Sequence, residues 1–600
     1  MASVSQAETR DTARDAFLGV DQSLSGQRWV LAPAHDDLAA SLSQTYGISE
    51  IAGRLLSARG IDLLEADAFL RGTLRTAMPD PSCLRDMDAA SKRLAEAIKQ
   101  REPITVFGDY DVDGATSAAC LLRFINGVGG QADAYIPDRM TEGYGPSPKA
   151  METLASRGTK LVITVDCGIG AHEALSAAKD AGLEVIVLDH HKADALLPPS
   201  VAAVNPNRDD DTSDLGSLAA VGVVFLTLVA VQRRLRTDGY FTKDRPEYPL
   251  LNLLDMVALG TVCDVVPLVG LNRLFVRQGL KVMAQRQNIG LRALADVAKL
   301  DERPDSGHLG FVFGPRINAG GRVGESSLGT RLLSTDDPAL AADIAARLDH
   351  YNQDRRALEA QVTQEALAQI GDPGDAPLIF VSGAGWHPGV IGIVASRLKD
   401  KFQRPAVVVG YENGVGKGSG RSISGVDLGN AVIDARTAGL LEAGGGHAMA
   451  AGLTVAEESI PALADHLTSL LQASIRSARS NRALTVDCLL SVGGATPELI
   501  ADIDQIGPFG VGNPSPKVAL AAVTVEKVDV VGADHIRMFV RDDARSRLKV
   551  MAFRAAESEM GARLLGGIGQ RFHMTGRLKR DDWGSTPKAE LHLIDAAPAS

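Results

Sequence analysis

The segment Ile104–Ala119, ITVFGDYDVDGATSAA, places Asp109, Asp111 and Asp113 at alternate positions directly behind an apolar run. The run ITVF predicts a buried strand, and the stretch GATSAACLLRFI predicts a helix after it. Carboxylates this close repel one another strongly unless positive charge neutralises them. We therefore expect a strand, a turn and a helix, with an acidic cluster at the turn that binds cations.

Similar units continue along the chain. Short strand-like runs, KLVITV and LEVIVL, alternate with helical stretches such as AHEALSAAKDAG, which predicts βαβ units and a parallel sheet. Acidic or histidine residues end these runs: Asp166 in VITVDCG, Asp189, His190 and His191 in VIVLDHH, and Asp264 in ALGTVCDVVPL, which we also interpret as a strand end. Open α/β sheets place their functional sites at this edge, so the sequence predicts one shared site.

The composition indicates a multidomain globular protein. The chain has 600 residues, 45% of them hydrophobic, enough for roughly three to five domains. No apolar run reaches the roughly 18 residues that span a bilayer, and the polar start MASVSQAETRDTARD lacks the core of a signal peptide. We therefore expect a cytoplasmic protein. Its five cysteines form no CxxC pair, which disfavours a disulfide framework and a structural zinc site.

The net charge of −12 weakens a nucleic-acid-binding interpretation without excluding it. Cations bound at acidic clusters would reverse the local sign of the charge. The distribution also matters: from Glu526 to Ser600 the chain carries 13 Lys/Arg residues against 11 Asp/Glu residues. The C-terminal region is therefore slightly basic within an acidic chain.

Four acidic sites and a His pair predict a centre for divalent cations. Carboxylates with a few imidazoles suit Mn²⁺ or Mg²⁺ better than a metal that prefers thiolates. The chemistry implied is two-metal hydrolysis of a phosphoester. Two alternatives stay open: Asp109 could cap the helix that starts near Gly114, and Cys167 could be a thiolate ligand or a small buried residue.

The ordered motifs DYDVDG, VDCG, DHH and GTVCD resemble the four motifs of the DHH phosphoesterase superfamily. With GPRINAGGR, WHPGVIGIVASR, GSGRS, GGGHAMAAG and PFGVGNPSP, the chain from about Trp29 to near its C-terminus is similar to the RecJ family of single-strand-specific exonucleases. The resemblance implies an enzyme, a metal-dependent 5′→3′ exodeoxyribonuclease that releases 5′-mononucleotides in DNA recombination and repair.

The resemblance and the hydrophobic patterns together divide the chain into five parts. We expect a parallel-sheet α/β domain, a long helix, a second α/β domain and a C-terminal β-barrel similar to an OB-fold. The boundaries are 1–85 for an N-terminal helical region, 86–335 for the catalytic DHH domain, 336–372 for the connecting helix, 373–478 for the substrate-binding DHHA1 domain, and 479–600 for the OB-like nucleic-acid-binding domain.

The resemblance also implies a role for each metal ligand. Asp111 would bind one of two Mn²⁺ or Mg²⁺ ions and Asp113 the other, with Asp166 bridging both. His190 and Asp264 would complete the shell of the second ion.

Three neighbouring residues have less direct roles under the same resemblance. His191 would face the scissile phosphate as a catalytic residue, and Asp189 would orient its neighbours from behind the ligands. Asp109 would be a further ligand of the first ion.

Arginines and glycine-rich segments supply candidates for binding the strand. The fork of an arginine suits a terminal 5′-phosphate, although Arg316 and Arg322 could instead pair with the acidic cluster. Glycines could let backbone N–H groups approach phosphates, or could only pack a tight turn. The candidates are Arg139, Arg316, Asn318, Arg322, Ser419, Arg421, Gly445, Gly446 and His447.

The predicted barrel combines basic and aromatic side chains, as single-strand-binding domains do. We expect only one or two of the aromatic side chains to face a base, because alternate strand residues point into the core. The set comprises Arg537, Arg541, Arg545, Arg547, Lys549, Arg577, Lys579 and Arg580 with Phe539, Phe553, Phe572 and Trp583.

Two other functions were weighed against the exonuclease. A DHH-family phosphodiesterase acting on short oligonucleotides or cyclic dinucleotides would not need the N-terminal region and the barrel. A binding module without activity would lack ligands that are all present here. The resemblance further implies single-stranded DNA as partner, a RecQ-type helicase and a single-strand-binding protein as associates, and a monomer without membrane contact.

Overall fold

The computed structural model describes residues 15–138, 141–480, 482–582 and 586–599. Its first α/β domain, the predicted catalytic domain, is built on a five-stranded parallel sheet in the order β3-β2-β4-β5-β6. The strands are β2 (Pro103–Gly108), β3 (Gln131–Tyr135), β4 (Leu161–Val165), β5 (Glu184–Leu188) and β6 (Ala202–Val204). The parallel α/β core predicted from the sequence is therefore confirmed.

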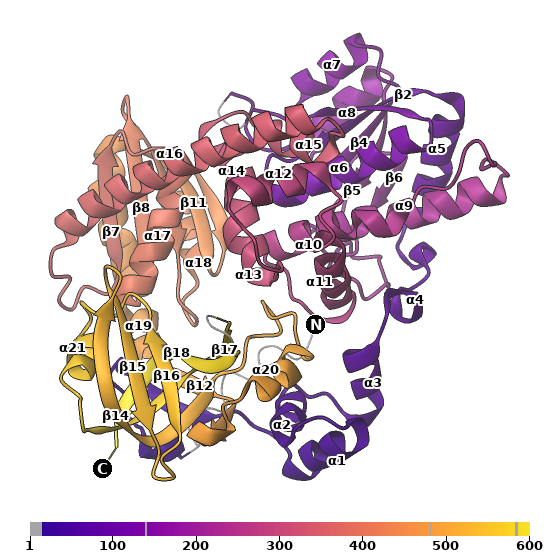
Figure 1. Cartoon of the computed structure of the whole chain (residues 1–600). Helices are drawn as coiled ribbons and strands as arrows, with labels where there is room; N and C mark the ends of the chain where they lie inside the picture. The colour runs from indigo at the N-terminus through magenta and orange to yellow at the C-terminus, as the bar shows by residue number, and fades with distance from the viewer. Residues whose placement is uncertain (1–14, 139–140, 481, 583–585, 600) are drawn as a thin grey trace.

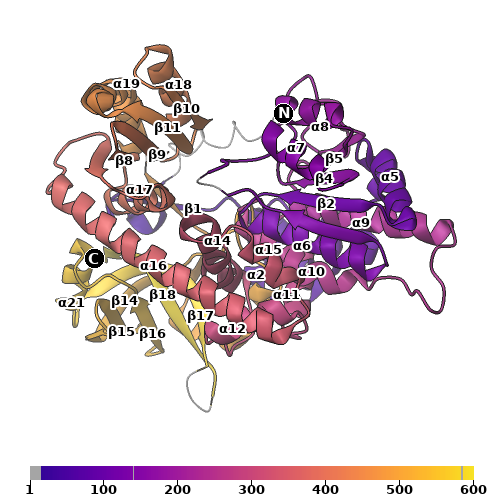
Figure 2. The same cartoon turned by 90° about the horizontal axis from the view of Figure 1, so that it is seen from above.

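Helices cover both faces of this sheet, as Figures 1 and 2 show. Successive strand residues point to opposite faces, so Val106 and Ile163 join one core while Phe107 and Val162 join the other. The first core is closed by α5 (Met87–Gln100), α6 (Val112–Gly127) and α9 (Ala220–Thr237), and the second by α7 (Pro148–Ser156) and α8 (His172–Asp180).

A helical layer follows the sheet and leads into the long connecting helix α16 (Pro338–Ile370). One expectation is wrong here: ALGTVC is no strand but the end of helix α10, which packs on α6 and α11. The layer comprises α10 (Leu254–Cys263), α11 (Gly270–Met283), α12 (Ile289–Val297), α13 (Ser306–His308), a π-helix (Leu309–Phe313), α14 (Gly314–Val323) and α15 (Leu328–Ser334).

The second α/β domain carries a five-stranded mixed sheet in the order β10-β11-β9-β8-β7. Its strands are β7 (Ile379–Ala384), β8 (Ala406–Glu412), β9 (Val415–Arg421), β10 (Ala443–His447) and β11 (Ala450–Ala456). Its helices are α17 (Pro388–Phe402), α18 (Leu428–Thr437) and α19 (Ile460–Ser480).

The C-terminal region is a closed barrel, as expected, because β14 pairs with both β15 and β17 and completes the circle β14-β15-β16-β18-β17. The strands are β13 (Cys488–Leu490), β14 (Val518–Val531), β15 (His535–Arg541), β16 (Arg547–Ala552), β17 (Arg571–Asp581) and β18 (Lys588–Pro598), with helices α20 (Pro497–Asp504) and α21 (Glu559–Leu565).

The N-terminal region packs on this barrel and is not purely helical. Strand β1 (Arg28–Leu31) pairs in parallel with β12 (Ala483–Val486), and the buried Trp29 donates its indole N–H to Asp595 at 2.9 Å. Four helices follow: α1 (Asp36–Tyr46), α2 (Glu50–Ala58), α3 (Leu63–Arg71) and α4 (Leu74–Ala77).

The barrel region also touches the catalytic domain directly. The buried Arg273 of α11 donates hydrogen bonds to the backbone carbonyls of Phe69 and Ile506, at 2.7 and 3.1 Å. The segment PFGVGN adds two more contacts, since Leu268 donates to Val511 O and Ser306 to Phe509 O. Within the described residues, no helix is long and apolar enough to cross a bilayer.

Candidate active site

The turn after β2 is organised by Asp111, which caps helix α6. Its Oδ1 accepts the backbone N–H groups of Asp113 and Gly114 at 2.9 and 3.1 Å. The capping alternative for Asp109 is therefore wrong, because Asp111 occupies that position. Gly114 is required for packing: a Cβ there would lie 2.4 Å from the carbonyl oxygen of Asp109.

Asp113 is held by the start of another helix. Its two oxygens accept the backbone N–H groups of Ala220 (2.7 Å) and Val221 (2.9 Å) at the N-terminus of α9. These amide dipoles and the positive end of α9 favour the ionised carboxylate. The side chain is 1% exposed, so its direction is fixed.

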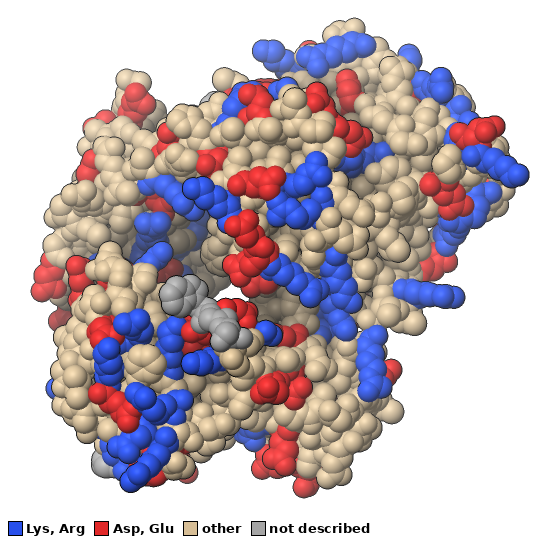
Figure 3. Space-filling view, in the orientation of Figure 1, with Lys and Arg blue, Asp and Glu red and all other residues tan. Residues whose placement is uncertain are grey.

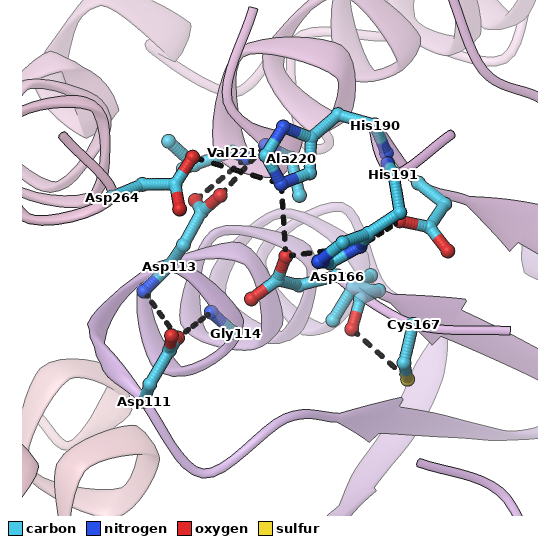
Figure 4. A network of polar contacts seen from close by, with 12 residues as sticks. Asp111, Asp113, Gly114, Asp166, Cys167, His190, His191, Ala220, Val221 and Asp264 are labelled. Atoms are coloured by element: carbon cyan, nitrogen blue, oxygen red, sulfur yellow. Dashed lines mark hydrogen bonds and ion pairs between the residues drawn. The ribbon is translucent and has the colours of Figure 1, made fainter. Parts of the chain in front are cut away.

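Asp166 and His190 join the separate strand ends into one cluster (Figure 4). Asp166 follows β4 with a φ of 58°, and its Oδ1 lies 3.3 Å from His190 Nε2. The same nitrogen lies 3.6 Å from Oδ2 of Asp264, the residue that ends α10. The other ring nitrogen, His190 Nδ1, lies 3.0 Å from Leu218 O, which leaves Nε2 as the ligand atom.

Asp189 is hydrogen-bonded to His191, one of the neighbours that the family resemblance expects it to orient. Its Oδ1 lies 2.7 Å from His191 Nδ1 and accepts the backbone N–H of His190 at 2.7 Å. Asn205 and Asn207 hold the same turn by donating to the carbonyls of His191 and His190. The half-exposed imidazole of His191 therefore turns its Nε2 edge away from Asp189.

The electrostatics of the cluster are those of a site that needs cations. Burial and the neighbouring carboxylates raise the pKa of Asp113 and of Asp166 well above the usual range. Burial and the charge of Asp111 raise the pKa of Asp264 to about 7. Burial lowers the pKa of His190, whereas the hydrogen bond that the His191 ring donates to Asp189 raises the pKa of His191.

The donor atoms fit two divalent ions. Asp109, Asp111 and Asp166 offer ligand atoms within 4.8 Å of one another, and so do Asp113, His190 and Asp264. His190 Nε2 and Asp264 Oδ2 are buried without a hydrogen bond to a described residue. Oxygen-rich sets with one imidazole suit Mn²⁺ or Mg²⁺.

Cys167 is not suited to metal binding. Its thiol is 2% exposed, donates to Val165 O at 3.3 Å, and has a pKa well above the usual value because it is buried. A buried neutral thiol is what the alternative interpretation expected.

The predicted phosphate-binding arginines differ in the partners that they contact. Arg316 pairs with Asp349 of α16 at 2.8 Å and donates to Val312 O, so the expected alternative of pairing with the acidic cluster is wrong for it. Arg322 donates to Gly389 O at 3.0 Å, a link between the two α/β domains. Arg139 lies outside the described residues.

The remaining candidates belong to β9 and the β10–β11 hairpin. Ser419 accepts a hydrogen bond from the half-buried Arg421 at 3.0 Å. In the hairpin, Gly446 is required for packing, because a Cβ would lie 2.3 Å from Ala450 O. Gly445 faces open space, and His447 is exposed.

A cavity of about 1300 Å³ lies at the junction of the catalytic domain, α16, the second domain and the barrel region. It reaches Cys263 and Val265, on either side of Asp264, and it includes Asn318 and Arg322. Figure 3 shows a hollow near the centre of the charged face. The lining carries four Asp/Glu residues (Glu302, Asp305, Asp504 and Asp582) against eight Lys/Arg residues (Arg277, Lys281, Arg303, Arg322, Arg355, Arg577, Lys579 and Arg580).

The barrel contributes to this cavity through the end of β17 rather than through its whole basic set. Several of the predicted basic residues are paired on the barrel itself: Arg537 with Asp529, Arg541 and Arg547 with Glu526, and Lys549 with Asp581 and Glu590.

The aromatic residues of the barrel divide between core and surface. Phe572 is buried in the barrel core, whereas Phe539 is half-buried and Phe553 is exposed. Trp583 lies outside the described residues.

Sequence reasoning missed two residues near the site. Tyr144 donates its hydroxyl to Asp166 O at 3.1 Å and packs edge-on against His191. Phe311 of the π-helix is 80% exposed and lines the cavity. In the sequence, Phe311 is marked only by its position just before GPRINAGGR. It lies there in an apolar run, which indicates a buried segment rather than a functional residue.

The fold and the site define a DHH-type phosphoesterase. Family models match residues 103–261 as the DHH family N-terminal domain, 375–473 as the DHHA1 domain and 486–595 as the RecJ OB domain. The single-stranded-DNA-specific exonuclease RecJ of Bacillus subtilis is 34% identical over 96% of this chain and 71% of its own length. The Escherichia coli RecJ is 35% identical over 77% of this chain and 82% of its own length.

Solved structures agree with this assignment. The crystal structure of RecJ from Thermus thermophilus in complex with Mn²⁺ matches with a TM-score of 0.80 and 28% identity, over 95% of this chain and 79% of that one. Its Mg²⁺ complex matches with a TM-score of 0.74. The chain belongs to the RecJ family of exonucleases.

Replacing Asp166 tests the shared-ligand assignment. We expect Asp166→Asn to lower hydrolysis by at least about tenfold, the smaller end of losses when partners at metal sites are replaced. The same change should stabilise the metal-free protein, because it removes one of several buried like charges.

The stability effect has a defined dependence on pH. Raised carboxyl pKa values mean that the folded state binds extra protons, so the contribution of these carboxyls to metal-free stability is largest at low pH and falls as pH rises through these values. Thermal midpoints in EDTA between about pH 5 and pH 8 should fall less steeply for Asp166→Asn than for wild type. Near-wild-type hydrolysis by the variant would contradict the assignment.

Proposed function

We propose that this protein is a single-stranded-DNA-specific exonuclease that digests from the 5′ end and releases 5′-mononucleotides in DNA recombination and repair. The observation that carries the proposal is the basic cavity whose lining includes Cys263 and Val265, the chain neighbours of the cluster residue Asp264. A net positive lining in a chain of net charge −12 is suited to a phosphate backbone. The cavity and the barrel beside it favour a long strand over a small phosphodiester.

Each cluster residue has a role in this mechanism. Asp109 and Asp111 would hold one divalent ion and Asp113, His190 and Asp264 the other, with Asp166 as a ligand of both; the ions would activate the attacking water and neutralise charge on the phosphate. The hydrogen bond to Asp189 raises the pKa of His191, which in its protonated form would donate Nε2–H to an oxygen of the scissile phosphate.

The lining also supports a preference for single strands. Phe311 presents an exposed ring to the cavity, and Val265, 63% exposed at a φ of 63°, projects beside Asp264. A β-branched residue rarely adopts this backbone conformation. We assign Phe311 to stacking on an unpaired base, a contact that a paired and stacked base cannot offer.

Recognition of the 5′ end is assigned to the second domain. Because Arg316 is already paired with Asp349, the half-buried Arg421 beside Ser419 is the stronger candidate for a terminal phosphate. Arg322, Asn318, Gly445 and His447 would extend this surface. We further propose cytoplasmic action as a monomer, with a helicase and a single-strand-binding protein as associates.

The activity is tested with single strands labelled at either end. We expect Mn²⁺-dependent release of mononucleotides from the 5′ end, loss of activity in EDTA, and little digestion of a blunt duplex. Release from the 3′ end, or equal digestion of the duplex, would contradict the proposal.

Phe311→Ala tests the stacking contact. We expect KM for a long single strand to rise by about tenfold or more, because stacking on an aromatic side chain is worth about 1–3 kcal/mol per base. The thermal midpoint should not change, since the ring is 80% exposed. Leu196→Ala, at a 76% exposed leucine away from the cavity lining, is the matched control. An unchanged KM would exclude the stacking role.

Arg421→Ala tests end recognition. We expect the variant to lose its preference for 5′-phosphorylated over 5′-hydroxyl strands, and Arg421→Lys not to restore it, since lysine keeps the charge but not the fork. Arg476→Ala, at an exposed arginine of α19, should keep the preference. A retained preference in Arg421→Ala would move the assignment to another residue.

A further inference from the structure

A second cavity, of about 340 Å³, lies within the catalytic domain behind one wall of the central cavity. Glu302, Arg303 and Pro304 line both cavities. The π-helix also separates them, with Phe313 facing the smaller cavity and Phe311 the larger one. π-Helical turns recur at functional sites. The smaller cavity plays no part in the mechanism described above.

A buried carboxylate faces this cavity. Asp255, near the start of α10, is 2% exposed and lines the cavity. Its Oδ1 accepts the backbone N–H of Met256 at 2.7 Å, and no described side chain donates a hydrogen bond to it. Burial raises its pKa to about 7. A buried acceptor of this kind is stabilised by a ligand that brings hydrogen-bond donors.

The walls and the rim differ in chemistry. Apolar side chains, among them Leu291, Leu300 and Phe313, surround the space next to Asp255. At the rim lie Arg292 and Arg303, both exposed and without an ion pair to a described side chain. Two other rim charges are already engaged, since Arg286 pairs with Asp296 and Glu302 pairs with His308. The exposed Asp301 also lies at the rim.

We propose that this cavity binds a guanine nucleotide. The flat apolar base would lie against Phe313 and Leu291, and its adjacent N1–H and N2–H groups would donate to the carboxylate of Asp255. The phosphate would lie at the rim against Arg292 and Arg303. The volume is at the lower end of ligand pockets, about 300 Å³, and suits a mononucleotide.

Guanine fits the carboxylate better than the other bases. Its Watson–Crick edge carries two neighbouring donors, whereas adenine and cytosine each pair one amino group with ring acceptors that a carboxylate would repel. A cationic ligand would pair with the carboxylate of Asp255, but it would be repelled by the arginines at the rim.

Calorimetric titration of the full-length protein with GMP, in EDTA and without DNA, tests the proposal. EDTA removes cations from the catalytic centre, and the result does not depend on nuclease activity. We expect saturable binding with a Kd below about 1 mM. AMP and CMP should bind at least about tenfold more weakly, the smaller end of discrimination by a bidentate pair.

Two variants and a control locate the site. Asp255→Asn, which keeps the shape of the side chain, should weaken the binding of GMP by at least about tenfold. The variant should instead bind xanthosine monophosphate, whose C2 carbonyl accepts a hydrogen bond from the new amide. Arg292→Ala should weaken GMP but not guanosine. Lys299→Ala, at an exposed lysine that does not line the cavity, should change neither. Absence of saturable binding, equal affinity for AMP, or wild-type GMP binding by Asp255→Asn would each overturn the proposal.

The shared wall predicts one further effect, which rests on the proposed function. GMP should change the affinity of the metal-free protein for a long single strand, and Arg292→Ala should remove that change at the same GMP concentration. Direct GMP binding without any effect on the strand would overturn this coupling while leaving the nucleotide site in place. Failure of the strand to bind at all would count against the proposed nuclease instead.

Discussion

The mutual repulsion of buried carboxylates is the constraint on which this structure depends. Asp113 and Asp166 are almost fully buried within reach of Asp111 and Asp264, an arrangement that is unfavourable without cations. The parallel sheet brings Asp111, Asp113 and Asp166 together because its strands end at one edge, and the C-terminus of α10 adds Asp264. The start of α9 then fixes Asp113, and Asp189 fixes His191. The ions would therefore bind a centre whose geometry the backbone has already set.

The members of the acidic cluster could be predicted from the sequence because the position of most of them depends only on the strand directly before them. A strand followed by a polar residue places that residue at the sheet edge, whatever the rest of the fold does. Asp264 was placed correctly in the cluster but on the wrong element. Its apolar run is too short to distinguish a strand from a buried helix, and packing against α6 and α11 decides for the helix.

Residues whose roles depend on distant partners could not be predicted in this way. The sequence context of Arg316 indicates a phosphate ligand, but its guanidinium pairs with Asp349, more than thirty positions along the chain. Phe311 belongs to the apolar run LGFVF, whose composition alone indicates a core segment. In the π-helix Phe311 is 80% exposed, whereas Phe313 is buried. The basic residues of the barrel are a second example. The sequence predicts that they bind the nucleic-acid strand, but carboxylates on the barrel itself pair with many of them.

The junction at Arg273 has a topological consequence. The catalytic domain meets the barrel region by two routes: through α16 and the second domain along the chain, and through the contacts of Arg273, Leu268 and Ser306 with Phe69 and the PFGVGN segment. The parallel pairing of β1 with β12 also connects the N-terminal helices to the barrel region, so they belong to the same ring of contacting domains. If a strand reaches the metal site through this ring of contacts, it must thread a free end, and a strand without ends would be excluded. Under the proposed function, the architecture itself would make the enzyme an exonuclease rather than an endonuclease.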